Sequence, residues 1–141
     1  CDPAYESLFS SYVDYPIVFA RPGKERQDSV LSGLYALSKE TKWVCIHDGA
    51  RPFLQPKDLE AVINTGKTTG AAALATPVHS TIKQVGKDHL VEKTLDRSSL
   101  WSLQTPQVVS YDILQKGYAK AKEQNLHMTD DVSFAEAVGH P

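Results

Sequence analysis

The sequence predicts an α/β fold with a doubly wound, mostly parallel sheet. Strand-like and helix-like segments alternate along the chain, which is typical of strand–helix–strand units whose strands share one sheet. One strand-like segment, residues 70–78, is small and apolar almost throughout, as expected for a strand covered on both faces. A chain of 141 residues with 41% hydrophobic residues can bury one core, so we expect a single domain over residues 1–141.

The first strand–helix unit lies near the start of the chain. Residues 17–20 are a short apolar run that predicts a strand, and residues 26–37 carry apolar side chains at helical spacing behind a charged first turn. A second apolar run at residues 43–47 predicts a buried strand, in which Cys45 occupies a position suited to a small buried side chain. These segments begin the alternation that the fold class requires.

A second helix follows and leads into the strand at residues 70–78. Pro56 suits the first turn of this helix, because the backbone N–H that proline lacks has no hydrogen-bond partner within a helix at that position. Leu59, Val62 and Ile63 give the helix one apolar face, and Gly66 predicts its end.

Two strand-like runs, residues 81–85 and 90–95, flank Gly86 and predict a hairpin arm over residues 79–96. An isolated hairpin is marginally stable in water, so this one is expected to pack against another surface, such as a second subunit. An edge hairpin of the same sheet fits the sequence equally well.

The last third of the chain predicts two helices. Ser110 can cap the first, and Thr129 can cap the second. Asp130 and Asp131 then fall in the first turn of that second helix, where negative charge is favourable, although a role in a site is also open to them.

Composition excludes several classes of function. Fifteen basic and seventeen acidic residues give a formal net charge of -2, which provides no broad basic surface for nucleic acid or an anionic membrane. No run approaches the roughly 18 apolar residues of a membrane span. Cys1 and Cys45 are too few for a disulfide scaffold, which favours a reducing compartment, and the five histidines contain no i, i+4 pair of the kind that binds zinc. A dinucleotide-binding dehydrogenase remains an alternative from the alternation alone, but no GxGxxG fingerprint is present.

The segment 47–52, HDGARP, is the most informative in the chain. It places Asp48 and Arg51 at the carboxyl end of a predicted buried strand, the edge at which α/β sheets bind ligands. A carboxylate and a guanidinium on one turn suit a site for a divalent cation and an anionic substrate. A solvated turn in which Arg51 pairs with Asp48 is the alternative, and His47 is read as an oriented strand-end residue rather than a base.

Six segments together carry a family resemblance. In order and approximate spacing, they resemble the 2-C-methyl-D-erythritol 4-phosphate cytidylyltransferase family, with Cys1-Asp2-Pro3 and GKERQDS similar to its plant and chlamydial branch. The segments are residues 23–30, 47–52, 75–83, 94–97, 103–107 and 129–131. The resemblance implies a Rossmann-like nucleotidyltransferase that makes CDP-methylerythritol and pyrophosphate from CTP and methylerythritol phosphate, in the non-mevalonate route to isoprenoids.

The resemblance also implies a nucleotide site. Gly23 and Ser29 match the residues that lie against cytosine and ribose. Asp48 is the catalytic candidate for a contact to magnesium and ribose, because an in-line attack brings two anionic groups together and a magnesium ion held by a carboxylate would offset their charge. A close glycine carbonyl and a first-turn hydroxyl can supply the hydrogen bonds that distinguish cytosine from uracil. Without the resemblance, Ser29 reads as an ordinary helix-start residue. Arg26 is long enough to brace this site, or it belongs to a surface turn.

The substrate contacts implied by the resemblance come from two subunits. Arg51 and Thr105 match contacts to methylerythritol phosphate, and Thr81 and Arg97 match contacts that arrive from the partner subunit on the hairpin arm. Arg51 and Arg97 are therefore catalytic candidates, because guanidinium groups bind phosphate oxygens in fork geometry. Without the other matching segments, Thr81 reads as a strand former and Arg97 as the partner of a nearby acid. Pro106 predicts an extended turn at Thr105.

Two features of the family are missing from the sequence, namely a glycine-rich basic loop that wraps the triphosphate and a closing strand that carries a lysine. We therefore expect the chain to be part of a longer parent protein, and the isolated chain to release little or no pyrophosphate. The expected partners are CTP, methylerythritol phosphate, magnesium as cofactor and a second copy of the chain, with no nucleic acid or membrane. Bacterial cytoplasm, or plastid stroma for a plant source, is the expected location. The alternative is a noncatalytic α/β fragment that dimerises or binds nucleotide weakly.

Overall fold

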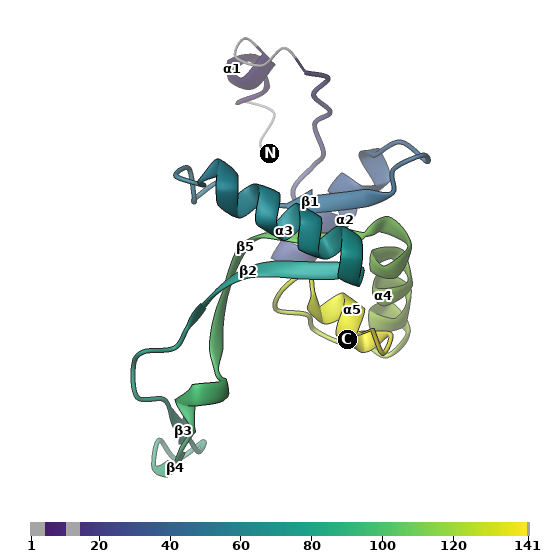
Figure 1. Cartoon of the computed structure of the whole chain (residues 1–141). Helices are drawn as coiled ribbons and strands as arrows, with labels where there is room; N and C mark the ends of the chain where they lie inside the picture. The colour runs from purple at the N-terminus through teal and green to yellow at the C-terminus, as the bar shows by residue number, and fades with distance from the viewer. Residues whose placement is uncertain (1–4, 11–14, 141) are drawn as a thin grey trace.

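The computed structural model describes residues 5–10 and 15–140, so Cys1 and the Cys1-Asp2-Pro3 segment lie outside the described residues. A three-stranded sheet forms the centre of the molecule (Figure 1). In spatial order its strands are β1 (Trp43–Ile46), β5 (Trp101–Ser110) and β2 (Ala71–Pro77). The predicted α/β class is thus confirmed.

The direction of the strands differs from the prediction. β5 pairs antiparallel with both β1 and β2, so every pairing in the described sheet is antiparallel, and the prediction of a mostly parallel sheet was wrong for these residues. β1 and β2 still point the same way and are joined through helix α3 (Pro56–Thr69), as in the expected strand–helix–strand unit. A strand from much later in the sequence lies between them. Local periodicity identifies a strand but carries no information about such an insertion.

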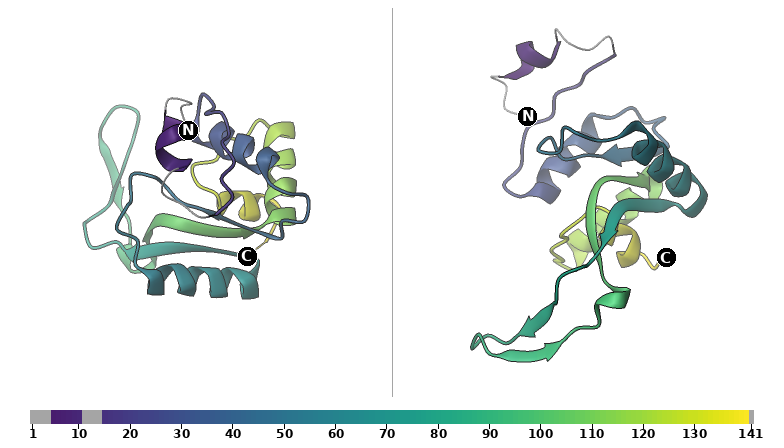
Figure 2. Two further views of the ribbon diagram at one scale, coloured as in Figure 1. Left: turned by 90° about the horizontal axis from the view of Figure 1, so that it is seen from above. Right: turned by 60° about the vertical axis from the view of Figure 1, so that its left-hand side comes forward.

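Helices cover both faces of the sheet. Helix α3 lies on one face, and the other face carries α2 (Arg26–Ala36), α4 (Tyr111–Glu123) and α5 (Ser133–Ala137), as Figure 2 shows from above. The main core lies between this second group and the sheet. Its buried members are Leu34, Val44, Val109, Leu114, Ala121 and Phe134.

Caps and turns define the helix ends. Ser110 caps α4 as predicted, since its hydroxyl accepts a hydrogen bond from the Ile113 amide at 3.3 Å. Thr129 does not cap α5, which begins four residues later at Ser133. Instead, the Asp130 carboxylate accepts hydrogen bonds from the amide and hydroxyl of Ser133, while Asp131 turns inward. Asp130 therefore does stabilise the start of a helix, although that helix begins later than predicted. The predicted helix-start role was wrong for Asp131.

Two expectations about the first half of the chain were wrong. Residues 17–20 form no helix or strand, and Val18 is exposed, because no described strand pairs with this segment. Cys45 is exposed on β1, which is an edge strand of the described sheet.

The short helix α1 (Glu6–Ser10) precedes this region. Within residues 5–10 and 15–140, no helix is long and apolar enough to cross a membrane.

The predicted hairpin forms between β3 (Lys83–Val85) and β4 (Val91–Thr94). It connects β2 to β5 through the short 3₁₀ helix η2 (Arg97–Ser99), and it projects away from the sheet and helices (Figures 1 and 2). Val85, Leu90 and Val91 are exposed on it. A projecting pair of strands with exposed apolar side chains is available to pack against another surface.

Helix α3 continues through the glycine that was expected to end it. Gly66 is buried where the helix crosses β5, and a Cβ atom there would lie 2.8 Å from Cγ1 of Val108. The helix ends instead at Gly70, whose φ of 92° lies in the left-handed region that favours glycine. Gly66 therefore permits close helix–sheet packing.

This contact predicts opposite effects for two helical glycines. Gly66→Ala should lower the free energy of unfolding by about 1–3 kcal/mol, because the added methyl group overpacks a buried contact. Gly33→Ala in α2 is the matched control, since a Cβ atom at Gly33 meets nothing within 4 Å. It should leave stability unchanged or raise it by up to about 1 kcal/mol. Urea unfolding followed by circular dichroism measures both, and equal effects would contradict the packing role of Gly66.

Candidate functional site

The candidate site lies where the pairing of β5 is interrupted. Between the pairs Ala73–Gln107 and Ala75–Leu103, two steps along β2 correspond to four along β5, so β5 bulges around Thr105. Thr105 is thus part of a strand rather than the extended turn that was predicted, and its peptide bond to Pro106 is cis. β1 pairs with β5 only beyond this bulge, so the turn that follows β1 lies beside it.

Asp48 and Arg51 occupy this turn. The amide of Arg51 donates to the carbonyl of Asp48 at 3.0 Å, which closes the turn, and Nε of Arg51 lies 3.4 Å from Oδ2 of Asp48. The Arg51 guanidinium also donates to the side-chain oxygen of Gln104 on β5. Both charged side chains are partly exposed, at 38% for Asp48 and 46% for Arg51. The sequence had predicted their place at the end of the strand, and their pairing is the contact that the sequence analysis had given as the alternative.

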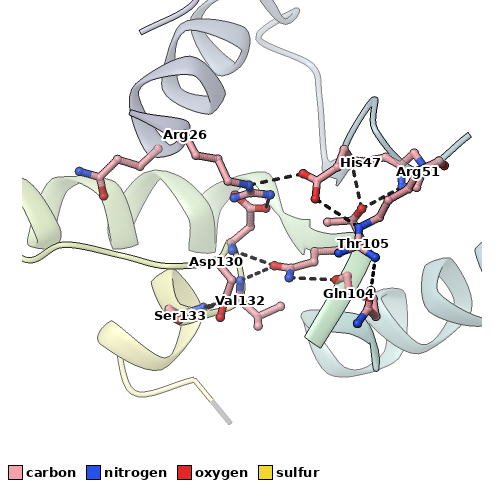
Figure 3. Close-up of polar contacts among 12 residues, drawn as sticks. Arg26, His47, Arg51, Gln104, Thr105, Asp130, Val132 and Ser133 are labelled. Atoms are coloured by element: carbon pink, nitrogen blue, oxygen red, sulfur yellow. Dashed lines mark hydrogen bonds and ion pairs between the residues drawn. The ribbon is translucent and has the colours of Figure 1, made fainter. Parts of the chain in front are cut away.

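A second arginine approaches Asp48 from the opposite side. Nη1 and Nη2 of Arg26 bind the two carboxylate oxygens of Asp131 at 3.0 and 2.6 Å, and Nε lies 3.5 Å from Oδ1 of Asp48 (Figure 3). The side chain of Asp131 is 0% exposed, and that of Arg26 is 39% exposed. Arg26 therefore joins a buried carboxylate to the partly exposed one.

Gln107 holds Asp131 in place from β5. Its side-chain oxygen accepts hydrogen bonds from the amides of Asp131 and Val132 at 2.8 and 3.1 Å, and its nitrogen donates to the carbonyl of Gln104 at 3.1 Å. Gln107 is itself buried. Sequence reasoning missed the contribution of Gln107, and it left a site role for Asp131 open without naming Arg26 as its partner. One available signal was a glutamine directly before the buried pair Val108 and Val109, because a buried polar side chain requires partners.

The buried ion pair has linked electrostatic properties. Burial raises the pKa of Asp131, and the Arg26 guanidinium opposes that rise. Conversely, the hydrogen bond to Asp131 raises the pKa of Arg26. Asp131 thus depends on Arg26 to remain charged inside the protein.

The start of α2 brings the predicted nucleotide residues close to this pair. The amide of Gly23 donates to the hydroxyl of Ser29 at 2.9 Å, and that hydroxyl donates to the carbonyl of Glu25 at 3.2 Å. Glu25 and Asp28 form a reciprocal capping box around the first turn. A Cβ atom on Gly23 would collide with the side chain of Asp28, so the loop can fold back this closely only with glycine. Arg26 extends from the same turn toward Asp48.

His47 and Thr105 connect the turn to the strand. Oγ1 of Thr105 lies 3.1 Å from the amide nitrogen of Asp48 and 3.1 Å from Nδ1 of His47. Nε2 of His47 lies 2.9 Å from the carbonyl oxygen of Arg51. Both ring nitrogens of His47 thus have structural partners, which agrees with its interpretation as an oriented strand-end residue.

Thr81 and Arg97 lie apart from this cluster. Both are exposed at the arm, where Arg97 donates to the carbonyl of His79 and Asp96 caps η2 through the Ser98 amide. Within the described chain, neither makes a polar contact with Asp48 or Arg51. A single copy of the chain therefore brings together the other predicted site residues, but not these two.

Comparison with known proteins identifies the family. The sequence model described as 2-C-methyl-D-erythritol 4-phosphate cytidylyltransferase matches residues 3–141. The chain belongs to this family. A chloroplastic family member of Oryza sativa subsp. japonica is 43% identical over 99% of this chain and 48% of its own length, and one of Chlamydia pneumoniae is 45% identical over 100% and 63%. The chain thus spans about half to two thirds of the length of these relatives.

Solved structures of the family have the same fold. The crystal structure of 4-diphosphocytidyl-2C-methyl-D-erythritol synthase from Anaerococcus prevotii matches with a TM-score of 0.87 at 26% identity, covering 98% of this chain and 64% of that one. The cytidylyltransferase of Francisella tularensis matches with a TM-score of 0.80 at 33% identity, covering 92% and 62%.

The donor set at the site suits a magnesium ion that takes few protein ligands. Among the described residues, no group of three or more histidine, cysteine, aspartate or glutamate side chains is arranged to hold a metal. Magnesium in nucleotide sites usually takes one or two carboxylates and completes its shell with phosphate oxygens and water. Asp48 is partly exposed, whereas Asp131 is buried and paired on both oxygens. Asp48 is therefore the carboxylate that fits this role.

The buried ion pair predicts a pH-dependent loss of stability. Arg26→Met removes the group that opposes the raised pKa of Asp131, so this carboxyl favours folding only while it is protonated. The loss should be small near the ordinary Asp value of 3.8 and should grow with rising pH. At pH 7 we expect about 2 kcal/mol, below the full value for a buried pair because Arg26 is partly exposed.

Arg51→Met is the matched control, since it removes an arginine whose pairing with Asp48 is exposed to solvent. It should change stability by no more than about 0.5 kcal/mol. Urea unfolding at several pH values measures both variants. A loss for Arg26→Met that shrinks as the pH rises would contradict the proposed dependence of Asp131 on its partner.

Proposed function

We propose that this chain carries the nucleotide and substrate face of a cytidylyltransferase, which transfers a cytidylyl group from CTP to 2-C-methyl-D-erythritol 4-phosphate and releases pyrophosphate. Membership in the family supports the reaction. The observation that carries the proposal is the position of Asp48 between the guanidinium groups of Arg26 and Arg51, beside the first turn of α2. The site offers a carboxylate for a cation and guanidinium groups for anions within one small region.

Cytidine recognition is assigned to the start of α2. Gly23 and Ser29 fold against one another in the loop that leads into this helix, which places a backbone turn and a hydroxyl close together. Such groups can bind the ring edge and exocyclic amine of cytosine. Asp48, linked to the same turn through Arg26, would contact the ribose and a magnesium ion. When bound, magnesium would neutralise part of the phosphate charge.

Methylerythritol phosphate would bind on the other side of Asp48. Arg51 can turn its partly exposed guanidinium to phosphate oxygens, and the family resemblance also assigns Thr105 to this substrate. An attacking phosphate needs no proton removed, so the work of the site is to position two anionic groups for an in-line displacement. This agrees with an oriented His47 that has structural hydrogen bonds on both nitrogens.

A second copy of the chain is proposed to complete the site. Thr81 and Arg97 lie on a projecting arm and make no polar contact with Asp48 or Arg51 within the described chain. An arm that reaches a neighbouring subunit would bring Arg97 to the substrate phosphate there. The proposed location follows the source, with bacterial cytoplasm or, as for the chloroplastic rice relative, the plastid.

Nucleotide titration tests the proposed function on the chain itself. In the presence of magnesium, the chain should bind CTP at least about tenfold more tightly than UTP or NAD, because cytosine-specific hydrogen bonds distinguish them. Isothermal titration calorimetry measures these affinities. A noncatalytic scaffold should bind none of the three, and this outcome would refute the proposal.

Asp48→Asn tests the magnesium assignment in the parent protein. This change keeps the size of the side chain but removes its charge, so turnover should fall by about two to three powers of ten. Asp112→Asn, in the exposed first turn of α4, is the matched control and should leave turnover unchanged. If Asp48→Asn shows a native circular dichroism spectrum and near wild-type turnover, Asp48 is a turn residue only.

Subunit mixing tests the arm. In the parent protein, Arg97→Met should weaken use of methylerythritol phosphate far more than binding of CTP, since the lost guanidinium serves the nucleophile. Mixing Arg97→Met with Asp48→Asn subunits should restore activity, because a mixed dimer has one site with both defects and one with neither. Native mass spectrometry verifies that mixed dimers form. Mixed dimers without activity would show that both residues serve the same chain's site.

A further inference from the structure

The first turn of α2 presents one side to the site and another to the helices behind it. Arg26 and Ser29, three residues apart, lie on one side of the helix. From this side, the Arg26 side chain reaches Asp48, while Ser29 binds the loop that precedes the helix. Gln27 points elsewhere, because one residue along a helix is a rotation of about 100°. Contacts to Gln27 can therefore hold the turn without touching a ligand.

Two hydrogen bonds attach Gln27 to distant parts of the chain. The hydroxyl of Tyr118 in α4 donates to the backbone carbonyl of Gln27 at 3.0 Å. The side-chain oxygen of Gln27 accepts from the backbone amide of Met128 at 3.1 Å. These partners lie 91 and 101 residues away in the sequence, and both bonds are partly buried. The turn is thus attached to α4 and to the segment between α4 and α5.

The hydroxyl of Tyr118 has a well-defined position. The ring of Tyr118 stacks on that of Phe134 in α5, with the ring centroids 3.9 Å apart, and Phe134 is buried. Burial, and then the negative charge of Asp131, raise the pKa of this hydroxyl above its usual value. It therefore stays protonated near neutral pH and donates to the Gln27 carbonyl.

We propose that Tyr118 and Gln27 are positioning residues for nucleotide recognition, which hold the first turn of α2 in the orientation that distinguishes CTP from UTP. The groups assigned to cytosine, at Gly23 and Ser29, belong to the loop and turn that these two hydrogen bonds fix. Hydrogen bonds weaken steeply as they depart from linear geometry, so a loosened turn would lose its cytosine-specific bonds. UTP does not make those bonds and would lose little. The inference rests on the proposed function for the identity of the nucleotide.

An exposed contact to the same turn provides a comparison. Nδ1 of His127 lies 3.1 Å from a carboxylate oxygen of Glu25, and both side chains are exposed. A contact of this kind contributes little. We therefore expect the partly buried bonds to Gln27 to fix the turn, and the contact of His127 to matter much less.

Amide hydrogen exchange on the 141-residue chain tests the anchoring without any ligand. Tyr118→Phe removes only the hydroxyl, so it should speed exchange of the Ser29 amide, which donates to the carbonyl of Glu25, by about threefold to tenfold. Tyr35→Phe is the matched control, because it removes a hydroxyl from an exposed tyrosine of the same helix. Gln27→Met, which lacks the acceptor, should speed exchange of the Met128 amide. Exchange at Ser29 that Tyr118→Phe leaves unchanged would overturn the inference.

Binding and kinetics test the effect on recognition. With magnesium present, Tyr118→Phe should weaken CTP binding by about threefold to tenfold while UTP affinity stays within about twofold. In the parent protein, the KM for CTP should rise by the same factor, with kcat and the KM for methylerythritol phosphate within about twofold.

Two controls separate this role from a general effect on the fold. His127→Gln removes the exposed contact to the turn, and Gly66→Ala introduces a packing defect between α3 and β5. Both should preserve the preference for CTP over UTP. An equal loss of affinity for both nucleotides in Tyr118→Phe, or a preference lost equally in Gly66→Ala, would contradict the proposed role. If wild-type protein shows no preference for CTP, the proposed function fails, while amide exchange still decides whether Tyr118 and Gln27 anchor the turn.

Discussion

The bidentate ion pair between Arg26 and Asp131 is the interaction on which the site depends. A carboxylate with no exposed surface is costly unless its charge is matched, and Arg26 binds both of its oxygens. The pair connects segments that are 105 residues apart in the sequence. Gln107 links this ion pair to the central strand β5, because its side-chain oxygen accepts a hydrogen bond from the backbone amide of Asp131. These contacts hold three segments together at the end of β1: the start of α2, strand β5, and the loop that precedes α5.

The pair also sets the electrostatics of the exposed part of the site. Asp131, Arg26, Asp48 and Arg51 form a chain of alternating charge that runs from the core to the surface. The two carboxylates and two guanidinium groups have a net charge of zero, so the positive charge available for an anion is local to this site. The protein as a whole has a net charge of -2 and no broad basic surface. Under the proposed function, a cation would replace Arg51 as the partner of Asp48, and a phosphate would replace Asp48 as the partner of Arg51, while the ion pair between Arg26 and Asp131 stays in place.

Sequence reasoning predicted those features that depend on neighbouring residues. Helical spacing indicated α2, turn chemistry indicated the hairpin, and a cap indicated α4, because each signal lies within a few residues. The placement of Asp48 and Arg51 after an apolar strand was predictable for the same reason. Features that depend on distant segments were missed: β5 lies between two parallel strands, Gly66 packs against Val108, and Asp131 points inward to Arg26. No local pattern encodes which distant group will satisfy a buried charge or fill a helix–sheet contact.

A double-mutant cycle between Arg26 and Asp131 tests the central claim most directly. Arg26→Met alone leaves a buried carboxylate without a partner, whereas Asp131→Asn combined with it removes that charge. We therefore expect the double variant to unfold at a higher urea concentration at neutral pH than Arg26→Met alone, with a coupling free energy of about 1–3 kcal/mol. Effects that add within about 0.5 kcal/mol would show that the two residues are not coupled, and would contradict a site organised around this ion pair.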